Sequence, residues 1–208
     1  MNRQRLAGIV LVGGLTLSAL AGCASVATTD GPLILTPAPL SAPLPTGDVI
    51  GQGLVLDPAD GDPVLCLGPV AESAPPQCSG IPLVGWSWDG VPGPTDTDGT
   101  VWGSYAVAGT YAGDSFTVMG EPILLALYDP APLPDPTDGV AGTATDAELE
   151  SIAEELIPRL GDQVLGSAVH DGWLWVDVIW DDGSIQSAVD KEYGSTAVAI
   201  RSALVPLG

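Results

Sequence analysis

Clusters of Asp, Gly and Pro divide residues 48–128 into short runs, and this division constrains the fold more than any other feature. Stretches such as DPADGDP and DGVPGPTDTDG separate apolar or alternating runs. These runs lie at 49–56, 63–67, 81–88, 101–111, 115–119 and 123–128. Short runs bounded by turn residues are typical of β-strands, and no helical period competes with them. The region is therefore predicted to be all-β.

One of these runs is longer than the others. VWGSYAVAGTYAG contains Gly103 and Gly109, which permit sharp coiling, and the turn after it predicts a hairpin into SFTV. Five or six short strands with one long, glycine-bent member predict a small closed barrel of the OB type, or a compact sandwich, over 48–128. A domain of about 80 residues buries a core that is only marginally sufficient for stability, and a covalent cross-link stabilises such a domain.

The first residues of the chain have the pattern of an export signal. Arg3 and Arg5 precede an apolar run over 6–20, which is short for a membrane span and suits a signal peptide. The run ends in LAGC, and this ending resembles the lipobox of bacterial lipoproteins. The resemblance implies that 1–22 is removed, that the thiol of Cys23 carries the fatty chains, and that the protein is anchored on the extracytoplasmic face of the cell membrane.

The other two cysteines form an even pair once Cys23 is assigned to the lipid. Cys66 and Cys78 lie close together in the sequence, on either side of a Pro-Pro pair. In an exported protein, nearby cysteines pair by default. A disulfide between them is predicted, and the chain-entropy model gives loops of about 15 residues roughly 3 kcal/mol of stabilisation.

The charge of the mature chain is strongly negative. After the signal only Arg159, Lys191 and Arg201 are basic, against 26 acidic residues in the whole chain. Affinity for phosphate backbones needs Lys and Arg, so nucleic acid is excluded as a partner class. A negative field of this kind favours a protein partner with a basic face.

Two proline-rich stretches divide the mature chain. The first, 23–47, contains TPAPLSAPLPTG and is predicted to be a semi-rigid tether of polyproline II type between the lipid and the folded body. The second, 129–144, begins DPAPLPDPTDG and is predicted to be a linker. The sequence thus predicts two domains, 48–128 and 145–208.

The second domain begins with a predicted amphipathic helix. Thr145 and Glu148 have the spacing of a capping box, and apolar residues recur at helical intervals after them. Pro158 and Gly161 are predicted to end the helix.

Two strands, a helix and a strand are predicted to follow. VLGSAV and WLWVDVIW flank an Asp-Gly turn, a helix is expected over about 184–193 with Gly194 as its C-cap, and AVAIRSALV is the last strand. This order predicts an αββαβ unit in which two helices cover one face of a three-stranded sheet.

Side chains alternate along a strand, so the sheet has one wholly apolar face and one mixed face. Trp173, Trp175, Asp177 and Arg201 are expected on the mixed face, away from the helices. An ion pair between Asp177 and Arg201 is expected if their strands are neighbours. This face is the first candidate binding surface.

The tryptophans give the second candidate surface. Two Trp-x-Trp pairs occur, Trp86 with Trp88 and Trp173 with Trp175. Residues two apart on a strand project to the same side, so each pair is a candidate platform for stacking on sugar rings or peptide side chains. The alternative interpretation is that these rings fill small cores or the contact between domains.

Several stretches taken together resemble a family of uncharacterised exported or lipid-anchored proteins of actinobacteria. These are LCLGPVAESAPPQCSG, VGWSWDG, WGSYAVAGTYAGDSFTV, VDVIWDDGSIQSAVDKEYG and IRSALVP. The resemblance covers about 48–208 and implies no activity, cofactor or catalytic residue.

Little in the chain points to catalysis. GlyAspSerPhe at 113–116 resembles the nucleophile block of GDSL-type esterases, but it lies in a predicted hairpin, and His170 is the only histidine. The acidic loops at 57–62 and 95–99 lack the spacing of a calcium loop. No metal, cofactor or catalytic residue is predicted.

The sequence therefore predicts a lipid-anchored envelope protein that binds or assembles, with an uncharged envelope glycan or a basic protein as partner. The alternative is an envelope-glycan hydrolase or modifying enzyme that uses paired carboxylates.

Overall fold

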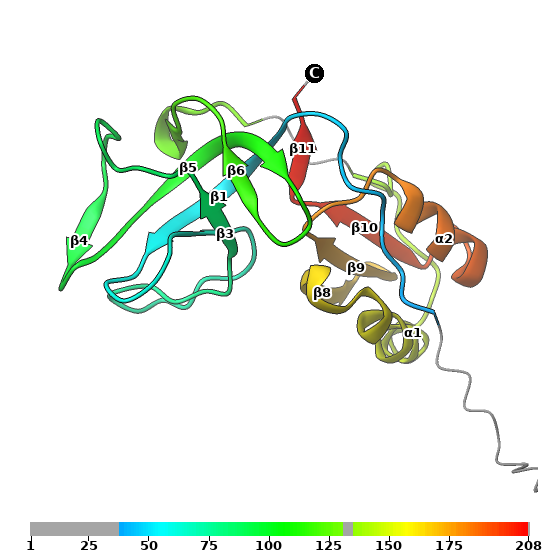
Figure 1. The fold of residues 1–208 in the computed structure, drawn as a ribbon. Coiled ribbons are helices and arrows are strands. Elements are labelled where there is room, and N and C mark those ends of the chain that lie inside the picture. The colour runs from blue at the N-terminus through cyan, green and yellow to red at the C-terminus, as the bar shows by residue number, and fades with distance from the viewer. Residues whose placement is uncertain (1–37, 131–134, 208) are drawn as a thin grey trace, which may run out of the picture. The chain divides into compact units, whose positions relative to one another are not determined.

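A computed structural model describes residues 38–130 and 135–207 (Figure 1). The predicted signal peptide, Cys23 and most of the predicted tether lie outside the described residues. The described residues group as one compact unit.

Five strands close into a barrel, so the predicted small β-barrel is confirmed. They are β1 (Val49–Asp57), β2 (Val64–Cys66), β3 (Ile81–Val84), β5 (Thr100–Tyr111) and β6 (Phe116–Val118). The order around the barrel is β1-β2-β3-β6-β5, and β5 pairs again with β1 to close it. The pairing of β3 with β6 is parallel, and the others are antiparallel.

The long strand β5 holds the barrel together through its glycines. Its residues 101–109 pair with the whole of β1, and its last residues pair with β6. A Cβ atom at Gly109 would overlap the carbonyl of Thr117 and the ring of Phe116, and one at Gly103 would overlap the ring of Tyr105. Only glycine allows such close approach, which agrees with the coiling expected of this run.

Three short strands extend the barrel sheet. They are β4 (Thr95–Thr97), β7 (Ile123–Leu124) and β11 (Leu204–Pro206), and the turn η1 (Leu125–Leu127) follows β7. β4 and β7 pair with β5, and β11 pairs with β1. The sequence predicts a single last strand from AVAIRSALV, and the structure divides it at Ala203. The C-terminal strand of the chain thus belongs to the barrel sheet.

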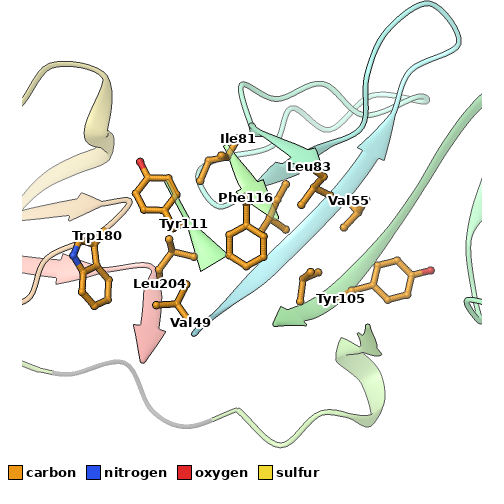
Figure 2. Packing of buried hydrophobic residues seen from close by; sticks show 11 residues of the cluster. Val49, Val55, Ile81, Leu83, Tyr105, Tyr111, Phe116, Trp180 and Leu204 are labelled. Atoms are coloured by element: carbon orange, nitrogen blue, oxygen red, sulfur yellow. The ribbon is translucent and has the colours of Figure 1, made fainter. Parts of the chain in front are cut away.

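The barrel core contains large aromatic side chains (Figure 2). Tyr105 and Phe116 are fully buried, and Tyr111 lies nearby. Trp180 and Leu204 join this core from the C-terminal part of the chain. The core therefore combines residues from distant parts of the sequence.

A separate three-stranded sheet has the order β10-β9-β8. Its strands are β8 (Val164–His170), β9 (Trp173–Val178) and β10 (Val198–Ser202). β9 is antiparallel to β8 and parallel to β10. The helices α1 (Asp146–Leu160) and α2 (Ser184–Tyr193) cover one face, and the turn η2 (Gly161–Gln163) links α1 to β8 (Figure 1).

The helix ends follow the predicted caps, with one exception. The capping box of Thr145 and Glu148 is present, and Gly194 caps α2. The prediction that Pro158 ends the first helix is wrong, because α1 continues through it to Leu160. Gly161 ends the helix with a positive φ of 61°.

Residues 38–47, which we call the strap, pack on the body. The backbone N–H of Leu40 donates to the carbonyl of Arg159 at 2.9 Å. The indole Nε1 of Trp180 donates to the carbonyl of Pro43 at 2.8 Å. The last part of the predicted tether is thus bound to both α1 and the residues after β9.

Candidate functional site

The mixed face of the three-stranded sheet carries the ion pair that the sequence led us to expect. Arg201 lies opposite Asp177 on the neighbouring parallel strand. Its Nε donates to Oδ1 at 2.7 Å and its Nη2 donates to Oδ2 at 2.9 Å. Both side chains are partly exposed, at 36% and 39%. This bidentate geometry fixes the plane of the guanidinium.

Trp175 lies beside this pair, on the central strand β9. Its ring stacks on His170 with centroids 5.3 Å apart and an angle of 8° between the planes. The guanidinium carbon of Arg201 lies 5.0 Å from the same ring. The contacts thus come from both flanking strands, β8 and β10. Because His170 and Arg201 already contact the ring of Trp175, this ring is not an open platform for stacking.

Trp173 does not lie on an open surface. Its side chain is only 4% exposed, and its Nε1 donates to the carbonyl of Val140 at 2.8 Å. Residues 135–142, from the predicted linker, cover this end of the face, and Gly142 donates its N–H to Asp171. The expected pairing of Trp173 with Trp175 as one flat platform is absent for this reason.

The covering segment is ordered by its own side chains. Asp135 accepts hydrogen bonds from the hydroxyl and the N–H of Thr137, at 2.7 Å and 2.9 Å. These bonds hold the pKa of Asp135 below its usual value, and the charge of Arg201 adds a smaller effect in the same direction. The segment therefore lies within electrostatic reach of the ion pair.

Trp86 and Trp88 also differ from the predicted platform. β3 ends at Val84 and Gly85 follows with a positive φ of 79°, so strand alternation does not apply to the two rings. They meet edge to face, with centroids 5.0 Å apart and planes at 83°. The Nε1 of Trp88 donates to Asp57 at 2.8 Å. Both rings pack against the barrel core, as the alternative interpretation expected.

The predicted disulfide between Cys66 and Cys78 is present. Cys66 is the last residue of β2 and is buried, and the loop that it closes returns to β3. Gly68 in this loop packs against Leu165 of β8, where a Cβ atom would meet the carbonyl oxygen of Leu165 at 3.2 Å. The disulfide thus positions a loop of the barrel beside the three-stranded sheet.

Two adjoining pockets of about 600 Å³ and about 290 Å³ lie at this loop. Both are lined by Leu67, Gly68, Pro69 and Leu165, and we call them together the disulfide-loop cleft. Leu65, Val164 and Ile179 add apolar walls to the larger pocket. Asp177 and Arg201 line the smaller one. Ser79 and Asp162 add polar groups to the larger pocket. A concave site with apolar walls and a few fixed polar groups is the usual form of a binding site.

The sequence pointed to Asp177 and Arg201 but missed Leu67, Pro69 and Leu165. Nothing in an apolar pattern distinguishes a cleft wall from a core residue. The close approach of Gly68 to β8 is a long-range contact that only the fold brings about.

Within the described ranges, no helix is long and apolar enough to cross a membrane. In the same part of the chain, no three metal-ligating side chains gather at one place.

No protein-family model matches the chain, and comparison with curated proteins and with solved structures finds no match. The resemblance to exported proteins of actinobacteria stays a prediction.

Proposed function

We propose that the chain is a lipid-anchored protein of the cell envelope that acts by binding an envelope component in the disulfide-loop cleft, without chemistry of its own. In this proposal Cys23 holds the protein at the membrane, the barrel is of the OB type, and the C-terminal region is an αββαβ unit. A five-stranded closed barrel supports the OB assignment, and barrels of this class commonly bind extended ligands.

The observation that carries the proposal is the position of Arg201 in the cleft. Its Nε and Nη2 are used by Asp177, and Nη1 has no hydrogen-bond partner among residues 38–130 and 135–207. A ligand that lies along the apolar walls would meet, in the smaller pocket, a guanidinium whose plane is fixed and whose Nη1 carries two free N–H donors. Fixed donors of this kind provide specificity in apolar sites.

The same geometry favours binding over hydrolysis by paired carboxylates. Two carboxylates line the disulfide-loop cleft, Asp162 in the larger pocket and Asp177 in the smaller one. Both oxygens of Asp177 already accept hydrogen bonds from Arg201, so Asp162 has no free carboxylate partner among the described lining residues. A carboxylate engaged in this way is committed to holding the guanidinium in place.

The anchor is tested by membrane fractionation of cells that produce the wild type or Cys23→Ser. The wild type should remain with the membrane and carry fatty chains by mass spectrometry of its N-terminal peptide. An unmodified residue 23 in the wild type would contradict the lipid anchor.

The cleft is tested with Pro69→Arg, because this exposed residue lines both pockets and a long charged side chain there fills the cleft. Pro94→Arg is the matched control, since Pro94 is exposed on another loop and lines neither pocket. Immobilised protein in detergent is exposed to solubilised cell envelope. The wild type and the control should capture the same material, and Pro69→Arg should lose it. Equal capture by all three would contradict the proposal.

A further inference from the structure

The two edge strands of the three-stranded sheet differ in whether their outer backbone groups have hydrogen-bond partners. Beyond the edge strand β10 lies Gln186 of α2. The N–H of Ile200 donates to Oε1 of Gln186 at 2.8 Å, and Nε2 of Gln186 donates to the carbonyl of Val198 at 3.0 Å. The side-chain amide takes the place of a neighbouring strand, so this edge is closed to further pairing.

The opposite edge, formed by β8, is open. Among the described residues β8 pairs only with β9. Ser167 and Ala168 are exposed, and the strand VLGSAVH has neither Pro nor an Asp, Glu, Lys or Arg. Two features protect only the start of the strand: an irregularity between Val164 and Gly166, and Gly68 of the disulfide loop, which packs against Leu165. Natural edge strands usually carry charges or proline, so an open edge of this length is unusual in a protein that is otherwise so acidic.

Hollows follow β8 from Val164 to Val169. The disulfide-loop cleft is lined by Val164, Leu165 and Gly166 at the start of the strand. A further hollow of about 310 Å³ is lined by Ser167, Ala168 and Val169. The smaller pocket of the cleft reaches the mixed face at the ion pair, whereas the further hollow reaches the side of α1.

Such an arrangement fits an added strand. An extended peptide that pairs with a sheet edge gains affinity from main-chain hydrogen bonds and specificity from pockets for its alternate side chains. Successive side chains of a strand point to opposite faces. A strand beside β8 would therefore direct its side chains alternately towards the mixed face and towards α1.

The wall on the side of α1 is acidic. Glu150 and Glu154 line the further hollow, both are exposed, and they lie four residues apart on one helix. Like charges at this spacing repel each other, and a cation between them relieves the repulsion. The formal net charge of the chain is −21, so a basic partner is also attracted at long range.

We infer that the edge of β8 receives an extended polypeptide segment of a basic partner, which adds a fourth strand to the sheet and places a Lys or Arg over Glu150 and Glu154. The inference rests on the proposed binding function and names the partner class.

The probe is a synthetic peptide of about eight residues that alternates Thr and Lys, the length of an ordinary strand. Two matched peptides accompany it. One carries N-methyl groups on alternate amides, which keeps the charge and removes strand pairing, and the other has Glu in place of Lys. Binding to the full-length protein in detergent is measured by calorimetry, and backbone protection is measured by hydrogen exchange.

The unmodified basic peptide should bind at least about tenfold more tightly than its N-methylated form. It should also protect amides within Val164–His170, and the acidic peptide should not bind. Glu150→Lys plus Glu154→Lys should reverse the preference between the basic and acidic peptides. Asp89→Lys plus Glu121→Lys makes the same charge change at exposed positions on the barrel, outside the disulfide loop, and should leave the preference unchanged.

Equal binding of the basic peptide and its N-methylated form would show that surface charge alone causes binding, and it would overturn the inference. Absence of binding by the basic peptide would also overturn it. So would protection of amides outside β8 in place of those within it. The proposed function is judged separately. If the variant with both lysines on α1 still captures envelope material that Pro69→Arg loses, the cleft is the binding site and strand addition is overturned.

Discussion

The five-stranded barrel depends on contacts between distant parts of the chain, whereas the three-stranded sheet depends mostly on near neighbours. In the barrel, β1 near the start of the described chain pairs with β5 and with β11 at its end. The barrel core combines aromatic rings with aliphatic side chains, and it includes Trp180 and Leu204 from the other region.

The three-stranded sheet has a different core and different supports. The side chains buried between this sheet and its helices are aliphatic, such as Leu156, Leu174 and Val176, and they come from elements that follow one another between 146 and 202. The capping box supplies hydrogen-bond partners to the backbone at the start of α1. Gln186 does the same for the backbone at the edge of β10. Short-range sequence signals thus define this region. The barrel depends instead on a disulfide and on close contacts between residues that are distant in the sequence.

The largest expected effect is the loss of Phe116, which is fully buried in the barrel. Phe116→Ala should lower the free energy of unfolding by about 3–5 kcal/mol, because it leaves a cavity among aromatic rings. Because Trp180 and Leu204 belong to the same core, the whole described body should unfold in one transition. Urea unfolding followed by fluorescence and by circular dichroism measures both quantities.

Leu174→Ala is the matched change in the three-stranded sheet, with an expected loss of about 2–5 kcal/mol. Two separate transitions in either variant would show that the regions are independent, which would contradict the shared core.

Removal of the disulfide should lower the stability of the whole body and loosen the barrel loop further. Cys66→Ala plus Cys78→Ala should cost about 3 kcal/mol in the chain-entropy model, and the single unfolding transition should move accordingly. Hydrogen exchange should rise most in β2 and β3, which flank the loop, and by no more than the global loss of stability in β9 and β10. Reduction of the wild type is the control and should give the same pattern. A rise in β9 that exceeds the rise in β2 and β3 would contradict this assignment.

Replacement of Gln186 should open the closed edge of the three-stranded sheet. Gln186→Leu leaves the N–H of Ile200 and the carbonyl of Val198 without partners, at a cost of about 1–3 kcal/mol. The variant should also self-associate, which analytical ultracentrifugation detects. Ser187→Ala, at the exposed neighbouring position, should do neither. A monomeric Gln186→Leu of unchanged stability would show that the amide does not protect the edge.

The smallest expected effect concerns the cap of α1. Thr145→Ala should cost about 1 kcal/mol, because the hydroxyl no longer accepts from the N–H of Glu148. The N–H and hydroxyl of Thr145 also lower the pKa of Glu148 from its ordinary value of 4.5. That contribution is present above the pKa of the unfolded state and is lost as pH falls through the folded value.

The difference in stability between the wild type and Thr145→Ala should therefore shrink as pH falls below 4.5. Thermal unfolding over a series of pH values measures it. A difference that stays constant down to about pH 3 would contradict a role for the ionised Glu148.

Local patterns predicted much of what the structure contains. Alternating runs and turn clusters predicted a small β-barrel, the capping box predicted the start of α1, and cysteine spacing predicted the disulfide. The helix continued through Pro158 because a proline near the last turn removes only one hydrogen bond, and packing of Leu156 and Leu160 in the core offsets that cost.

The candidate site was less accessible to prediction. The ion pair followed from strand alternation, but the burial of Trp173 depends on a carbonyl at residue 140. The edge-on packing of Trp86 and Trp88 depends on where β3 ends.

By itself, the sequence determined the strand-rich and helical regions, the acidic charge and the pairing of Cys66 with Cys78, because hydrophobic periodicity, turn residues and cysteine spacing are local. Only the tertiary structure decided that β11 extends the barrel sheet, that the strap packs on the body, and that one edge of the three-stranded sheet is closed and the other open. Each of these depends on which distant backbone groups find hydrogen-bond partners, and such pairing is settled only when the whole chain packs.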